Sequence, residues 1–255
     1  MNNLPIIPKK QFTHFNKFLN KKFTLVPFTQ GQQSILLEVN SEIEEKDELT
    51  SEDIRLLVRE KLEAIKQVIS ECVIKDSIDD LPYFVIEELF LALRSKSIGE
   101  IIDLNYICKN QLEDESVCNN KLKLSIDVSK ISAEVDKEFN NEIVIYDEDG
   151  VKIGVVMKFM TLDDMIDSTY LEGSQLPFIT MLDSIFDNEA VYKKKDYSEE
   201  DLKNFFDSIS PEGLLNLKEK FFDRLPTIKY EDKITCNNCG KEHNINLKGL
   251  NDFFG

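Results

Sequence analysis

The chain alternates between stretches of helical and strand-like hydrophobic periodicity. From Ser51, "SEDIRLLVREKLEAIKQVISECVI" places apolar residues on one face of a helix. These residues are Ile54, Leu57, Val58, Leu62, Ile65, Val68 and Ile69. A second such helix is expected from Pro82 to a glycine stop at Gly99. An N-terminal β-hairpin and a helix opened by a Thr29 and Gln32 capping box are expected before them.

The periodicity changes to that of strands after residue 99. "EIIDLNYICKN" and "KLKLSIDVSKI" alternate, and "NEIVIYDEDGVKIGVVMKF" predicts a hairpin that turns at residues 147–150. Helical patterns resume at "TLDDMID" and continue through "LPFITMLDSIFD". Two short helices follow, with Ser198 and Ser210 as their N-caps. The stretch "TIKYEDKITCNNCGKEHNINLKGL" then returns the chain to β structure.

Four cysteines lie at the ends of these strand-like runs. Cys108 ends one run and Cys118 begins the next, while Cys236 and Cys239 form a C-x-x-C pair that Gly240 follows. Two hairpin tips that each offer two thiolates are typical of a zinc ribbon, in which tetrahedral zinc binds four sulfurs at ~2.3 Å. Four protein ligands leave no open coordination position, so we predict a structural zinc site made of these cysteines.

Three other interpretations of these cysteines are open. All four thiols could be free of metal, or the C-x-x-C pair could be redox-active, although no helix begins after Cys236 to activate it. His243 could replace one cysteine, although it lies inside the last predicted strand. Five cysteines and an N-terminus without a signal-peptide core favour a reducing compartment, where disulfides are rare.

The order of these patterns predicts an α+β fold in which helical segments pack with a β-rich part that contains the zinc-ribbon-like site. Residues 1–98 would form the N-terminal hairpin and helices, and residues 99–160 a β-rich segment with the first cysteine pair. Residues 161–224 would be helical. Residues 225–255 would form a C-terminal β-hairpin that carries the C-x-x-C pair and packs with residues 99–160.

Composition narrows the class of protein. No run approaches the ~18 to 20 apolar residues that cross a bilayer, so we expect no membrane contact. The net charge of −17 would repel a phosphate backbone, which argues against nucleic-acid binding. A zinc-ribbon nucleic-acid-binding module is the alternative from another class, but "LEDESVC" and "YEDKITC" are acidic where it would need Lys and Arg. With two histidines and no H-E-x-x-H, P-loop or G-x-S-x-G, we expect no enzyme.

Several longer stretches resemble the baseplate hub protein family of T-even-like contractile-tailed bacteriophages. The most specific are "LFLALRSKSIGE" at residues 89–100, "DNEAVYKKKDYS" at 187–198 and "GLNDFF" at 249–254. The similarity runs from about Leu4 to Gly255. It implies a phage protein that is made in the host cytoplasm and needed to build the central baseplate hub, and it implies no catalytic residue.

The resemblance leaves two roles open within hub assembly. The chain would be a permanent hub subunit, located in the virion baseplate, or an assembly chaperone that is absent from the finished virion. Either role predicts contacts with other hub and tail proteins, or self-association. Phe253 and Phe254 at the terminus would dock on the protein's own core or, as interface anchors, on a neighbouring subunit.

Overall fold

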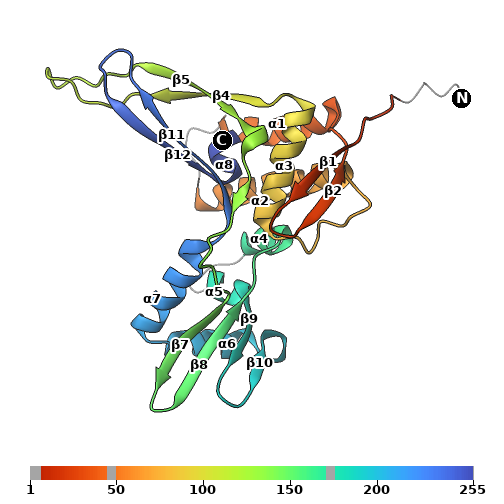
Figure 1. The fold of residues 1–255 in the computed structure, drawn as a ribbon, viewed down its shortest axis with the longest axis vertical. Coiled ribbons are helices and arrows are strands. Elements are labelled where there is room, and N and C mark those ends of the chain that lie inside the picture. The colour runs from red at the N-terminus through yellow and green to blue at the C-terminus, as the bar shows by residue number, and fades with distance from the viewer. Residues whose placement is uncertain (1–6, 45–49, 171–175, 255) are drawn as a thin grey trace, which may run out of the picture.

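The computed structural model describes residues 7–44, 50–170 and 176–254, and it confirms an α+β fold (Figure 1). The helices are α1 (Gln30–Glu44), α2 (Ser51–Cys72), α3 (Tyr83–Ser97), α4 (Leu162–Ser168), α5 (Leu176–Met181), α6 (Glu199–Ser208), α7 (Pro211–Lys220) and α8 (Gly249–Phe254). The strands are β1 (Phe12–Asn16), β2 (Lys21–Leu25), β3 (Val73–Ile74), β4 (Ile101–Ile107), β5 (Lys121–Asp127), β6 (Ala133–Glu134), β7 (Glu142–Glu148), β8 (Val151–Met157), β9 (Leu182–Phe186), β10 (Val191–Lys193), β11 (Thr227–Thr235) and β12 (Glu242–Lys248).

Helix boundaries follow the capping residues in the sequence. The backbone N–H of Thr29 donates to the Gln32 side chain at 2.7 Å, which confirms the predicted capping pair at the start of α1. The hydroxyls of Ser198 and Ser210 accept backbone N–H groups in the first turns of α6 and α7, as predicted. Gly99 follows the end of α3 and has a φ of 146°, a conformation that favours glycine.

The prediction of continuous helix through residues 176–187 was wrong. α5 stops at Met181, and residues 182–186 form β9, which pairs with β8 and β10. A short apolar run does not distinguish a buried strand from a helix by its periodicity. Pairing with β8 decides the outcome here, and it buries Leu182 and Ser184 on the same side of the strand. Residues 161–224 are therefore only partly helical.

Two hydrophobic clusters form the interior. The larger one joins α2 and α3 to residues of the N-terminal hairpin, β4, β5, α4, β11, β12 and α8. The smaller one lies between the sheet β10-β9-β8-β7 and helices α5, α6 and α7, with Phe206 and Phe221 fully buried in it. In Figure 1, the helices and strands around the smaller cluster form a lobe below those around the larger cluster. Apolar burial of this kind is the main favourable term in folding.

Two long hairpins, β4 with β5 and β11 with β12, project side by side from the upper part of the molecule (Figure 1). β11 also pairs with β6, where Ile228 faces Ala133. The C-terminal hairpin is thus attached to the middle of the chain through its base. The tips of the two hairpins carry the cysteines.

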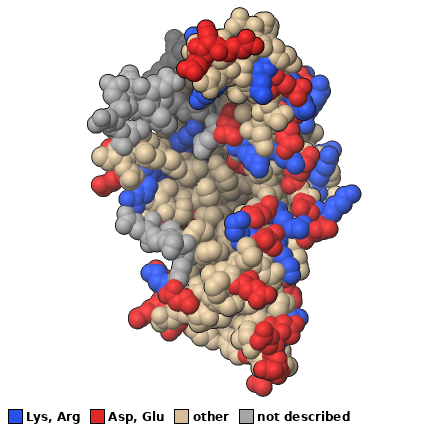
Figure 2. Space-filling view, turned by 90° about the vertical axis from the view of Figure 1, so that its left-hand side faces the viewer, with Lys and Arg blue, Asp and Glu red and all other residues tan. Residues whose placement is uncertain are grey.

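Acidic side chains are unevenly distributed over the surface. Figure 2 shows Asp and Glu gathered at the upper and lower ends of the face that it presents. The exposed turn between β7 and β8, residues 147–150, contributes three consecutive acidic residues. Within the described residues, the helices are too short or too polar to cross a membrane.

Candidate metal centre

The loop between β4 and β5 brings Cys108 and Cys118 together although nine residues separate them. The backbone N–H of Cys118 donates to the carbonyl of Asn110 at 2.9 Å, and Gln111 forms a β-bridge with Val117. The connector is therefore a small hairpin of its own. It returns Cys118 to a place beside Cys108, so the wide spacing in sequence becomes a close pair in space.

The second pair lies in the turn between β11 and β12. The backbone N–H of Cys236 donates to the carbonyl of Lys241, and that of Gly240 donates to the carbonyl of Cys236, each at 2.8 Å. Gly240 has a φ of 72° and nothing within 4 Å of where a Cβ would stand. The glycine permits the left-handed turn that points Cys236 and Cys239 in the same direction.

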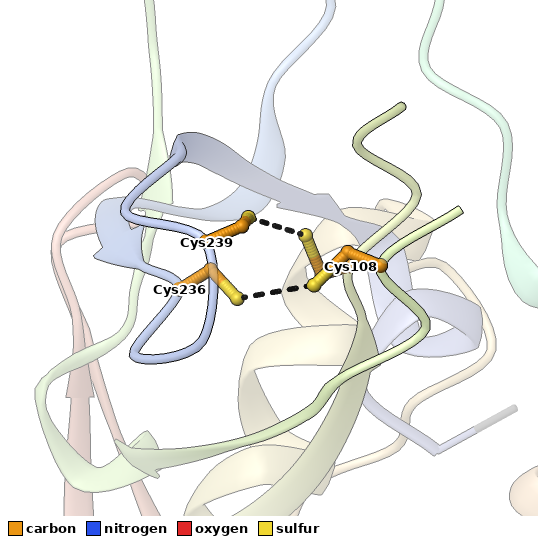
Figure 3. A group of neighbouring side chains, drawn as sticks. Cys108, Cys236 and Cys239 are labelled. Carbon is orange, nitrogen blue, oxygen red and sulfur yellow. Dashed lines mark hydrogen bonds between the residues drawn. The ribbon is translucent and has the colours of Figure 1, made fainter. Parts of the chain in front are cut away.

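The four sulfurs converge between the two loops, and Figure 3 shows the labelled side chains pointing toward one another. All four lie within 4.8 Å of one another. The Sγ atoms of Cys108 and Cys239 are 3.6 Å apart, and those of Cys118 and Cys236 are 3.8 Å apart. Zinc with four sulfurs at ~2.3 Å requires sulfurs ~3.8 Å apart, so the donor set fits a tetrahedral metal ion. These separations are far too long for disulfides, and the cysteines are free.

Each sulfur also lies within hydrogen-bonding distance of a side-chain nitrogen. The pairs are Asn110 Nδ2 with Cys239 (3.6 Å), Asn120 Nδ2 with Cys236 (3.5 Å), Asn238 Nδ2 with Cys118 (3.3 Å) and His243 Nε2 with Cys108 (3.1 Å). The Tyr106 hydroxyl lies 3.3 Å from His243 Nδ1. Donation from Tyr106 to Nδ1 would leave Nε2 protonated, so that His243 donates to the sulfur of Cys108. N–H donors of this kind orient metal-bound thiolates and stabilise their charge.

The surroundings of the thiols shift their pKa values in different directions. The backbone N–H of Cys239 is the main cause that lowers the pKa of Cys236 to about 6, with help from the N–H of Asn238. The side chain of Asn238 lowers the pKa of Cys118. Burial raises the pKa of Cys108 to about 12. The turn therefore favours the thiolate form at Cys236, which is the form that binds metal.

The remaining predicted site residues lie elsewhere. Phe253 in α8 is 1% exposed and packs in the larger hydrophobic cluster, while the side chain of Phe254 lies outside the described residues. His243 had entered the prediction only as an alternative ligand, and the structure places it against Cys108, beside the four sulfurs. The asparagines around the sulfurs carried no signal in the sequence, because their role arises from the meeting of two distant hairpins.

The four-cysteine cluster can hold a metal ion that fastens the middle of the chain to its end. No fifth protein donor and no open position are required for that role. A closed thiolate site of this type stabilises a fold and offers no place for a substrate.

The comparisons with known proteins give a family for this chain. The model of the T4 bacteriophage base plate protein family matches residues 8–255. The chain therefore belongs to this family of phage baseplate proteins. No curated protein and no solved structure matches the chain significantly.

Proposed function

We propose that this chain serves the assembly of the central hub of the baseplate in a contractile-tailed phage, as a hub subunit or as a chaperone of the hub. The observation that carries the proposal is the family match over residues 8–255, combined with the hub-like stretches of the sequence. Other tail and hub proteins are then its partners, in the host cytoplasm during assembly.

The metal centre supports a structural role. We infer that the ion is zinc, because four cysteine thiolates in a closed tetrahedral arrangement suit zinc. The two histidines are engaged within the fold: His14 Nε2 lies 2.6 Å from the buried carboxylate of Glu88, and His243 contacts Cys108. We accordingly infer no catalytic activity.

A phage that lacks this chain tests the hub proposal. Infected cells should then accumulate the peripheral parts of the baseplate without complete central hubs, and the wild-type chain supplied in trans should restore them. Hubs of normal composition in the absence of the chain would contradict the proposal.

The two roles within assembly differ in the finished particle. Mass spectrometry of purified virions should detect peptides of this chain at stoichiometric level if it is a subunit. Their absence from virions, together with failed hub formation in the mutant, would identify an assembly chaperone.

A further inference from the structure

The stretch "DNEAVYKKKDYS", residues 187–198, contributes Lys193, Lys194, Lys195 and Tyr197 to the lining of a cavity of about 630 Å³ in the lower lobe. Four lysines line this cavity, whereas its acidic lining residues are Asp183 and Glu199. Glu199 is already paired with Lys203 at 2.7 Å. A cationic cavity is unexpected in a chain with a net charge of −17. The floor of the cavity is apolar, formed by Ile179, Leu182 and Leu202.

The backbone that carries the lysines is held firmly. The carboxylate of Asp187 accepts the N–H groups of Glu189 and Ala190 and the hydroxyl of Tyr192, each at 2.8 Å. Asn188 donates to the carbonyl of Gly150 at 2.6 Å, which ties this turn to the neighbouring β7–β8 turn. After this turn, Lys193 ends β10, and Lys194 and Lys195 lie in a short 3-10 helix, so less ordering of the backbone is needed when an anionic group binds.

The lysines themselves are only partly neutralised. Lys158 lies 3.2 Å from Asp164, and Lys194 donates to the carbonyl of Thr180 at 3.2 Å. Burial, and then the charge of Lys158, lower the pKa of Lys194. Lys193 and Lys195 are exposed and form no ion pair with any residue that the structure describes. An added carboxylate would relieve the repulsion among these cations.

We propose that this lysine cavity is a docking site for an acidic segment of a partner protein, one in which carboxylates flank a large apolar side chain. The carboxylates would pair with Lys193, Lys194 and Lys195, and the apolar side chain would cover the floor. A protein segment fits better than a nucleic acid, because the lining combines lysines with the apolar side chains of Ile179, Leu182 and Leu202, and a phosphate backbone offers no apolar group to match them. Complementary charge of this kind speeds association and selects the partner.

The inference rests on the proposed assembly role for the class of partner, but purified protein tests it directly. The probe is a fluorescein-labelled dodecapeptide in which pairs of glutamates alternate with single leucines, and its matched control carries glutamine in place of every glutamate. Fluorescence anisotropy gives the Kd of each peptide. Wild-type protein should bind the glutamate peptide, more weakly as salt rises, and should not bind the glutamine peptide.

Charge reversal locates the site. Lys193→Glu with Lys195→Glu should weaken binding by at least about tenfold. Lys17→Glu with Lys22→Glu reverses two exposed lysines on the N-terminal hairpin, causes the same change in net charge, and should keep wild-type affinity. Thermal unfolding should show both variants folded, since all four side chains are exposed.

Four results would overturn the proposal. The first is that wild-type protein does not bind the glutamate peptide up to ~1 mM, and the second is that both double variants bind it equally weakly. The third is that a duplex DNA oligonucleotide binds more tightly than the peptide and loses affinity in the Lys193→Glu, Lys195→Glu variant. The fourth is that wild-type protein sediments as a dimer and this variant as a monomer. None of these results bears on whether hubs form in the phage that lacks the chain, so a failure here is distinguishable from a failure of the hub proposal.

Discussion

His243 and Tyr106 lie beside one thiol of the four-cysteine cluster. Their rings pack with centroids 5.1 Å apart, and His243 Nε2 lies 3.1 Å from the sulfur of Cys108. Cys108 is the thiol that burial disfavours most as an anion, so an N–H donor matters most there. The histidine is thus placed to stabilise a thiolate at Cys108.

We predict that His243→Phe keeps the metal stoichiometry of the wild-type protein but lowers zinc affinity by about 10- to 100-fold. Competition with a chromophoric chelator measures the affinity. His243→Gln retains an N–H donor and should recover part of the loss. If His243→Phe instead removes the metal altogether, the histidine is a ligand and the four-cysteine assignment fails.

Glu87 provides a pH-dependent contact between α3 and α8. It is 4% exposed and accepts the backbone N–H of Leu250 at 3.1 Å. Burial raises its pKa to about 7, although the N–H groups of Leu250 and Ile228 oppose the shift. As the pH rises, the unfolded chain ionises first, so stability present below about pH 4.5 is lost progressively until about pH 7.

Glu87→Gln cannot ionise and should not show this loss. Relative to wild type, its free energy of unfolding should rise by about 3 kcal/mol between pH 4.5 and pH 8. Urea titrations at several pH values measure the difference, and Glu63→Gln, at an exposed position of α2, is the matched control. Parallel pH profiles for wild type and Glu87→Gln would contradict the assigned shift.

At the scale of elements, the patterns that depend on local periodicity were predictable. Helices α2 and α3 and the two cysteine-bearing hairpins are present as predicted. The predicted apolar face of α2 was partly wrong, because Ile54 and Val58 are 49% and 40% exposed. The predicted positions on the later turns, Leu62, Ile65, Val68 and Ile69, are buried. β9 was not predicted, because residues 182–186 belong to a run with a helix-like pattern. Their pairing with β8, which the local sequence does not show, makes them a strand.

The residues of the candidate metal site were likewise predictable only in part. Cys236 and Cys239 were predictable from their C-x-x-C spacing, and Cys108 and Cys118 from their places at the ends of two strand-like runs. The asparagines, the contact of His243 with Cys108 and the lysine cavity were not, because each depends on which distant segments meet. Lys158 and Lys194, for example, are 36 positions apart in the chain, and β8 and β9 have to pair before they face the same cavity.

The terminal helix α8 has two proposed roles that truncation separates. Phe253 is 1% exposed, so deletion of residues 251–255 should lower the free energy of unfolding by about 3 kcal/mol if the tail serves the core. If the tail is instead an anchor for a neighbouring subunit, stability should stay intact and hub assembly should fail. Chemical denaturation and a complementation assay measure the two outcomes, and no change in either would exclude both roles.

At the scale of the whole molecule, aromatic rings join the two hydrophobic clusters. Phe159 contacts Phe84 of the larger cluster edge-on at a centroid distance of 5.2 Å. It stacks on Phe139 at 5.1 Å and lies 6.4 Å from Phe221, both in the smaller cluster. The ring therefore couples the upper and lower parts of the molecule.

Phe159→Ala should destabilise the protein by about 3 kcal/mol and split a single thermal transition into two, because the lobes lose their shared contact. Differential scanning calorimetry measures both effects. Phe15→Ala, at a ring that is 49% exposed, should change little. A single sharp transition in Phe159→Ala would show that the coupling lies in other contacts.

The four-cysteine cluster makes another long-range connection, between residues 108–118 and residues 236–239. Cys236→Ser removes one ligand from a site whose binding is coupled to folding, so the melting temperature should fall by about 10 °C. Cys72→Ala removes the fifth cysteine, which is buried in the larger cluster, and serves as the control that keeps the metal.

The most direct test is the metal content of the purified full-length protein, measured by elemental analysis and native mass spectrometry after exhaustive dialysis. We predict one zinc ion per chain in the wild-type protein and in Cys72→Ala, and none in Cys236→Ser. Wild-type protein that folds fully with far less than one equivalent of any metal would contradict the account, because the four thiols would then hold the two hairpins together without an ion.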